Sequence, residues 1–187
     1  AALNAALLLA ALAAAPLAAG TLAGVTMPET ATADGHQLQL NGMGLRSKAI
    51  FKVYVAGLYL PDKESDWNKV LGEDEPRRVV MHWVLNVGKD LICEGWHEGL
   101  EANNPKASAD VKKNFDALCT KMEDAKTGDR FTFTYLPGKG TEVAINDKVK
   151  GEPLGGKPFA DALFACWIGP HPVPGEAFRD GLMGKAK

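Results

Sequence analysis

The stretch LNGMGLRSKAIFKVYVAGLYL, residues 40–60, decides the fold of this chain more than any other part of the sequence. Its second half places apolar side chains at both sets of alternating positions, which is typical of a strand in a sheet that is covered on both faces. We therefore expect one long central strand here. Arg46 and Lys52 share the parity of Tyr54, so a guanidinium and a phenol would point into one layer. Burying a charge is costly unless an anion meets it, and the stretch therefore predicts an anion-binding site.

Hydrophobic periodicity in the rest of the chain predicts an α+β fold in one domain over 24–187. Strand-like runs come first, two amphipathic helices follow, and a hairpin and two more helices complete the chain. This order is typical of an antiparallel sheet with its helices segregated on one face. The predicted strands are 25–32, 36–40, 77–87, 129–136, 141–145 and a short run to Val149, and the predicted helices are 65–71 with Ser65 as its cap, 90–102, 111–122, and two with Pro158 and Pro174 in their first turns.

Composition and charge exclude several classes of function. The 187 residues are 46% hydrophobic and 24% charged, as in ordinary globular domains, and the net charge is -2. A chain with no basic stripe and no zinc-finger spacing is not expected to have a nucleic-acid partner. The histidine and cysteine spacings indicate no metal or haem site, so we expect no metal and no cofactor. The sequence also lacks a Gly-x-Ser-x-Gly motif, a phosphate loop and paired catalytic carboxylates.

The amino-terminal segment, residues 1–23, is predicted to be a secretory signal. No charged residue occurs before Glu29, and an apolar run is followed by Pro16 and by small residues that suit cleavage near residue 20. We expect the printed chain to start within such a signal, because a basic region and an initiator methionine do not precede the run. The alternative is a retained membrane anchor, since Leu3 to Val25 is about long enough to cross a bilayer. In both cases we expect the folded part to be periplasmic or otherwise exported.

The three cysteines agree with export. Cys93 and Cys119 lie on two consecutive predicted helices, and a disulfide between them would close a loop of about 27 residues, as suits an oxidising compartment. Cys166 is left over and lies within an apolar predicted helix. Buried free thiols are the alternative for all three.

Four blocks of sequence, taken in order, resemble the chalcone isomerase-like family, and in particular its short exported bacterial branch. They are LNGMGLR with KVYVAGLYLP, the hairpin GDRFTFTYLPGKGTEVAIN, the helix end FADALFACWIGPHP, and the closing GLMG. The resemblance spans about residues 24–184, and four ordered blocks are more specific than the glycine-rich element alone. It implies an open-faced β-sandwich, in which a large antiparallel sheet and a layer of helices on one face enclose a ligand cleft.

The resemblance also implies roles for single residues. In plant chalcone isomerases an arginine after the Gly-x-Gly element holds the substrate, and Arg46 matches it, but Tyr54 and Cys166 stand where the plant enzymes have threonines. The helix that supplies their catalytic tyrosine and asparagine has no counterpart in 90–125. Fatty-acid-binding members of the family instead pair the arginine with a tyrosine at the position of Tyr54, and both engage the ligand carboxylate. At this site the chain resembles the fatty-acid-binding members more.

We therefore predict an exported, non-catalytic binding protein whose partner is a fatty acid or another apolar carboxylate. Arg46 and Tyr54 would hold the carboxylate, because a guanidinium can bind it in a bidentate manner and a phenol adds a third donor. Eight residues of straight strand span about 26 Å. The two side chains can share one head group only if the chain bends or reverses near 47–48.

Core packing is the ordinary role of apolar residues at helical spacing, and some of them could instead line the cleft: Trp96, Phe115, Cys166 and Trp167. Two alternatives to a binding function stay open. The first is an accessory subunit of a membrane complex, anchored through residues 3–25, with a membrane partner and no ligand chemistry. The second is an isomerase or lyase that uses Arg46 to stabilise an oxyanion.

Overall fold

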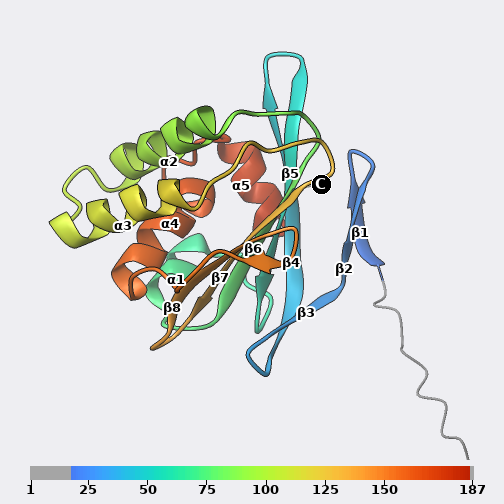
Figure 1. Ribbon diagram of the computed structural model, residues 1–187. Helices are drawn as coiled ribbons and strands as arrows, with labels where there is room; N and C mark the ends of the chain where they lie inside the picture. Colours follow the sequence, from blue (N-terminus) through green and yellow to red (C-terminus); the bar gives the residue numbers. More distant parts are fainter. Residues whose placement is uncertain (1–17, 186–187) are drawn as a thin grey trace, which may run out of the picture.

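The computed structural model describes residues 18–185 and shows an antiparallel sheet with helices on one of its faces (Figure 1). The large sheet runs in the order β3-β4-β5-β6-β7-β8-β9, and β1 and β2 form a separate pair. The predicted α+β fold is confirmed. The strands are β1 (Ala18–Leu22), β2 (Val25–Pro28), β3 (Thr30–Ala33), β4 (His36–Lys48), β5 (Phe51–Leu60), β6 (Arg77–Trp83), β7 (Arg130–Leu136), β8 (Gly140–Ile145) and β9 (Lys148–Val149), and the helices are α1 (Trp67–Gly72), α2 (Lys89–Asn103), α3 (Ala109–Thr120), α4 (Lys157–Ile168) and α5 (Glu176–Leu182).

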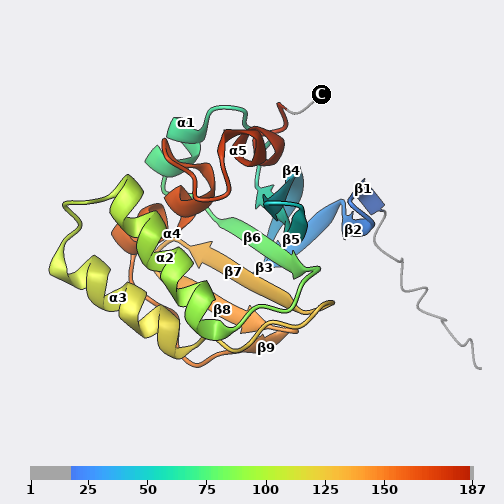
Figure 2. The same ribbon diagram turned by 90° about the horizontal axis from the view of Figure 1, so that it is seen from above.

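Helix α4 is the inner helix of the helical layer. It lies between the sheet and the outer helices α2 and α3 (Figure 2). Its side chains are therefore buried on nearly every side, from Phe159 to Ile168. Helices α2 and α3 bury one stripe each, as their periodicity predicts, and in α2 this stripe is Ile92, Trp96 and Leu100.

Strand β5 is covered on both faces, as the apolar pattern predicts. One face meets the helical layer, and the other meets a second apolar cluster that includes Val25 and Met27 of β2. Tyr59 points toward this second cluster, and its hydroxyl donates a hydrogen bond to the carbonyl oxygen of Pro28 at 3.0 Å. The β1–β2 pair thus closes the outer side of the sheet beside β4 and β5.

The single long strand predicted over 40–60 is wrong, because the chain reverses in the middle of it. Strand β4 ends at Lys48, β5 begins at Phe51, and these two residues pair with each other across a two-residue turn. Ala49 adopts φ of 54°, a left-handed conformation that alanine rarely takes. The reversal that the pairing of Arg46 with Tyr54 requires therefore occurs at 49–50, just beyond the expected 47–48.

The amino-terminal strands also differ from the expectation. The predicted strand over 25–32 is broken at Glu29, because β2 pairs with β1 whereas β3 pairs with β4. Strand β1 lies in the segment assigned to the secretory signal, and cleavage near residue 20 would fall inside it. The rest of that predicted signal or anchor lies outside the described residues.

Two helix starts differ by one or two residues from the expectation. Helix α1 is capped by Asp66 in place of Ser65, because the Asp66 carboxylate accepts a hydrogen bond from the backbone N–H of Asn68 at 2.9 Å. Helix α5 begins after Gly175, so Pro174 precedes it and does not lie in its first turn. Within the described range, none of the helices combines the length and the hydropathy needed to span a bilayer.

Candidate functional site

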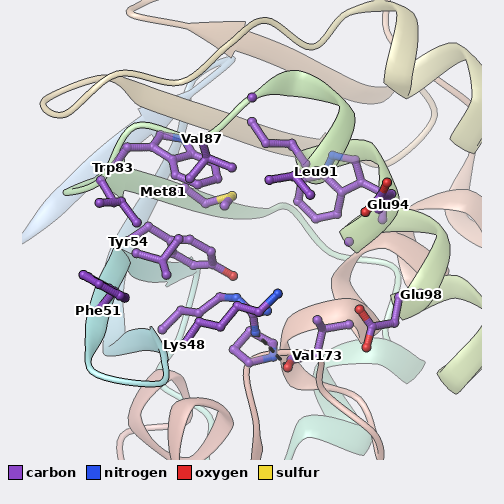
Figure 3. Close-up of a pocket in the computed structure, with 18 of the residues that line it drawn as sticks. Lys48, Phe51, Tyr54, Met81, Trp83, Val87, Leu91, Glu94, Glu98 and Val173 are labelled. Carbon is purple, nitrogen blue, oxygen red and sulfur yellow. Dashed lines mark hydrogen bonds between the residues drawn. The ribbon is translucent and has the colours of Figure 1, made fainter.

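A pocket of about 520 Å³ lies between the inner face of the sheet and helix α2 (Figure 3). Its volume falls in the range of small-molecule sites, roughly 300 to 1,000 Å³. Strands β4, β5 and β6, helices α2 and α4, and the loop before α5 supply its walls. The lining residues are Arg46, Lys48, Ala49, Phe51, Val53, Tyr54, Met81, Trp83, Leu85, Asn86, Val87, Gly88, Leu91, Ile92, Glu94, Gly95, Trp96, Glu98, Cys166, Trp167, Val173 and Pro174.

Arg46 and Tyr54, which the sequence places in one binding site, are directly opposite each other on β4 and β5. Cross-strand partners point to the same face of a sheet, so the guanidinium and the phenol both reach the pocket. The reversal at Ala49 brings them together, since they are eight positions apart in a chain that folds back on itself.

A β-bulge in β5 decides which neighbouring side chains face the pocket. Arg46 pairs with Tyr54 and Ser47 pairs with Lys52, so Val53 is left without a partner in β4. The extra residue shifts the alternation by one position, and both Val53 and Tyr54 line the pocket while Lys52 does not. The expectation that Lys52 shares the layer of Tyr54 is therefore wrong, because simple alternation does not continue across a bulge.

The guanidinium of Arg46 is oriented by the loop that precedes α5. Its Nη1 donates a hydrogen bond to the carbonyl oxygen of Val173 at 2.8 Å. Among the described residues no carboxylate lies within ion-pair distance of Arg46, and the guanidinium carries further N–H donors. Arg46 is thus a positioned and half-buried cation that retains donors for an anion in the pocket.

Tyr54 is buried except at its hydroxyl end, which points into the cavity (Figure 3). Its ring packs edge-on against Trp83 and Phe178, with centroid distances of 5.2 and 5.8 Å. Burial raises the pKa of Tyr54 well above its usual value, and Arg46 opposes this shift. In the described part of the chain this hydroxyl makes no hydrogen bond, and the nearby indole N–H of Trp167 is also without a partner. Tyr54 therefore stays a neutral donor across the physiological pH range.

Aromatic side chains form the apolar part of the pocket. Trp96 and Trp167 meet edge to face with centroids 5.2 Å apart, and both line the cavity, which is the alternative to core packing left open for them. Cys166 also lines it. Phe115 does not, because it is fully buried beneath α3 against Phe159. Phe115 therefore has the ordinary core role, and the alternative of cleft lining is wrong for this residue.

Two residues at the mouth of the pocket are not predicted by the sequence. Leu85 and Leu91 line the mouth and are 36% and 61% exposed. A signal was present for Leu91, since it is an apolar residue of α2 outside the buried stripe of that helix. Leu85 offers no such signal, because it continues the alternation of the predicted strand 77–87. That predicted strand is too long, since β6 ends at Trp83 and Leu85 lies in the loop that follows it.

Charged residues of both signs line the mouth of the pocket. Lys48, at the end of β4, and Arg46 line the pocket from β4, while Glu94 and Glu98 line it from α2. Figure 3 shows Lys48 near Val173, on the opposite side of the cavity from Val87 and Leu91. An anionic group is therefore favoured on the β4 side and disfavoured on the α2 side.

The thiol of Cys166 does not suit nucleophilic chemistry. Burial raises the pKa of the Cys166 thiol to about 12, which disfavours the reactive thiolate in the pocket. Cys93 and Cys119 are free in this structure, but Cys93 Sγ lies 3.8 Å from the carbonyl oxygen of Cys119. The expected disulfide stays a prediction. In the described part of the chain, no cluster of side chains has the composition of a metal site.

The arrangement suits binding of an amphipathic anion. One face of the pocket offers a fixed guanidinium and a phenol, and the rest offers indole, phenyl and aliphatic surface. A carboxylate with an apolar tail matches both parts, because the head can take charge-assisted hydrogen bonds while the tail leaves water.

Comparisons with known proteins agree with this fold. The model of the chalcone isomerase-like family matches residues 19–184. The crystal structure of a fatty-acid-binding protein from Arabidopsis thaliana is similar, with a TM-score of 0.68 and 15% sequence identity, over 86% of this chain and 92% of that one. At such an identity the similarity concerns the fold alone.

A bacterial relative is similar in sequence. An Efem/EfeO family lipoprotein from Staphylococcus haemolyticus is 29% identical over 136 residues, which is 67% of this chain and 47% of the relative. The chain thus spans about half the length of this curated relative.

Proposed function

This chain belongs to the chalcone isomerase-like family, and we propose that it is an exported, non-catalytic binding protein that holds a fatty acid or a similar apolar carboxylate. The observation that carries the proposal is the cross-strand pairing of Arg46 with Tyr54 at the head of an apolar pocket. Support for the ligand class comes from the Arabidopsis thaliana relative, which is described as a fatty-acid-binding protein. Support for export comes from the bacterial relative, which is described as a lipoprotein.

In this proposal Arg46 binds the carboxylate with the N–H groups that Val173 leaves free. Tyr54 donates a further hydrogen bond to the same carboxylate. The alkyl tail lies along Trp83, Trp96 and Leu91, where burial of each methylene contributes about 0.8 kcal/mol. A longer tail is expected to bind more tightly until it fills the pocket.

The test is a calorimetric titration of the purified full chain with dodecanoate. Arg46→Gln should weaken binding about 10- to 100-fold, because it removes a charged donor from a partly desolvated site. Lys52→Gln is the matched control, since it removes a cation from the same hairpin but from the face turned away from the pocket. Methyl dodecanoate, which lacks the carboxylate, should bind wild type and Arg46→Gln equally weakly. Equal dodecanoate affinity of wild type and Arg46→Gln would refute the proposal.

A further inference from the structure

Exposed large apolar side chains gather at the mouth of the pocket. Ile50 is 89% exposed, Phe51 58% and Leu91 61%, and Leu85 lies on the same rim. Three of these four residues also line the cavity, and Ile50 is the sequence neighbour of one of them. Exposed apolar residues that surround a pocket entrance are typical of a surface that meets another apolar body.

The tip of the β4–β5 hairpin carries the most exposed of these residues. It projects beyond the neighbouring strands (Figure 1) and is exposed from Ser47 through Lys52. Lys48 and Lys52 flank Ile50 and Phe51, and the bulge in β5 sends Lys52 away from the pocket while Lys48 faces it. Among the ion pairs of the described residues, neither lysine takes part. The tip is thus an apolar point with a lysine on each face.

We propose that this tip, residues 47–52, inserts into a bilayer that contains anionic phospholipid. Apolar side chains with flanking lysines are the chemistry that places a segment at a membrane interface, where the ammonium groups meet phosphates and the apolar groups enter the acyl boundary. Because Phe51 both lines the pocket and lies on the exposed tip, an apolar molecule could pass from the bilayer to the cavity without crossing water. The inference does not depend on which ligand the pocket holds.

The shape and charge of the tip favour a lipid surface over a protein partner. A stable protein interface buries about 1,200 Å² or more, whereas the tip offers two apolar side chains on a narrow hairpin. The acidic residues Glu94 and Glu98 of the pocket belong to α2, and residues 47–52 include no acidic side chain, so the tip itself carries only positive charge. A surface dense in phosphate complements that charge and needs no shaped counterpart.

The first measurement is flotation of the full chain with vesicles of phosphatidylcholine, with and without phosphatidylglycerol. The tip variant Ile50→Ser/Phe51→Ser should float at least 10-fold less with the anionic vesicles than wild type. Lys48→Gln/Lys52→Gln should lose about 25-fold on anionic vesicles and little on neutral ones, since each lysine near an anionic surface contributes a factor of about five. Val149→Ser is the matched control, because Val149 is an exposed apolar residue (54%) far along the sheet at β9.

A second measurement reports on the tip alone, whatever the amino-terminal segment does. Phe51→Trp and Val149→Trp each add one indole, and the emission added over wild type is followed with vesicles that contain brominated lipid. The indole at 51 should shift to shorter wavelength and be quenched, and the indole at 149 should not. An unquenched indole at 51 in vesicle-bound protein, or equal flotation of the tip variant and wild type, would overturn the proposal. Failure of the wild-type protein to float with vesicles, with its tip covered by a protein partner instead, would also overturn the proposal.

Failure of this inference and failure of the proposed function give different results. Arg46→Gln should still float like wild type while it loses dodecanoate. Ile50→Ser/Lys52→Gln, which changes only tip residues outside the pocket lining, should still bind dodecanoate in solution while it loses anionic vesicles. Either proposal can therefore fail its test while the other one holds.

Discussion

Gly42 of β4 lies against Gly181 of α5, so closely that a Cβ added to Gly42 would come within 2.1 Å of the Gly181 carbonyl oxygen. The contact is reciprocal, since a Cβ on Gly181 would lie 2.4 Å from the carbonyl oxygen of Met43. The two glycines let the backbone of a helix pack on the backbone of a strand. The contact holds α5, the helix that follows the loop whose Val173 orients Arg46, against β4.

Replacing Gly42 with alanine is expected to lower the free energy of unfolding by about 3 kcal/mol, because backbone atoms of α5 must move to admit the methyl group. Chemical denaturation of the purified protein measures this change. Gly72→Ala is the control, since no atom lies within 4 Å of a Cβ there. Equal stability of the two variants would show that α5 does not pack on β4 in this way.

Tyr54 and Tyr59 lie on the same strand and are expected to respond in opposite ways to removal of the hydroxyl. Tyr54→Phe should weaken dodecanoate binding about tenfold and leave stability nearly unchanged, because no intramolecular hydrogen bond depends on that hydroxyl. Tyr59→Phe should cost about 1 kcal/mol of stability, because it breaks the bond to Pro28, and should not change binding. Paired titrations and denaturation curves test both. The assignment of Tyr54 fails if its variant binds like wild type.

The stability of the chain is expected to fall above pH 10, partly through Tyr54. Burial raises the pKa of this phenol above its ordinary value of 10, so at higher pH the unfolded chain releases a proton that the folded chain keeps. The free energy of unfolding must then decrease as the pH rises. Tyr54→Phe should therefore lose less stability than wild type between pH 10 and about pH 12. The slope of denaturation free energy against pH measures this, and identical slopes would contradict it.

Cys93 and Cys119 are expected to form a disulfide in an oxidising environment. The pKa of the Cys119 thiol is raised to about 12 by burial and by Cys93 beside it, so spontaneous oxidation should be slow. With a disulfide oxidoreductase, the thiols titrated in the unfolded protein should fall from three to one, and stability should rise by about 3 kcal/mol. Cys119→Ala should show two thiols both with and without the oxidoreductase. Three thiols after such treatment would rule the bridge out.

Hydrophobic periodicity is sufficient to predict the helices and the class of fold. Periodicity does not reveal the turn within 40–60. Helices α2 and α3 show regular apolar spacing, and burial of that stripe is what holds them on the sheet. The turn at Ala49 has no glycine or asparagine, so local propensity favours a continuous strand. Pairing of β4 with β5 over their whole length overrides that propensity, and such pairing is a tertiary effect.

The shared position of Arg46 and Tyr54 at the pocket was predictable, but the rest of the pocket lining was less so. The cost of an unpaired buried cation singles out Arg46 within an apolar run, and the family resemblance adds Tyr54. The bulge at Val53 has no sequence signal, because its position depends on the register of two strands. Phe115 and Trp96 have the same helical spacing, and only the packing of α3 against α4 distinguishes the core residue from the pocket residue.

Gly95 provides a way to fill the pocket without disturbing the fold. It lies on the pocket side of α2, and a Cβ there would meet no atom within 4 Å. Gly95→Leu should weaken dodecanoate binding at least tenfold because its side chain occupies the space of the tail. It should also raise the free energy of unfolding by about 1 kcal/mol, since glycine is a poor helix residue. Gly99→Ala, one turn later, is the contrasting variant.

At Gly99 a Cβ would lie 2.5 Å from Cys166 Sγ, so its replacement should lower stability because α2 packs on α4 there. The pair of variants separates filling of the pocket from damage to the helix. Loss of binding together with a gain of stability for Gly95→Leu, and loss of stability for Gly99→Ala, would show that the tail lies between α2 and the sheet. Unchanged dodecanoate affinity in Gly95→Leu would instead place the tail elsewhere, because a leucine in that position leaves no room for it.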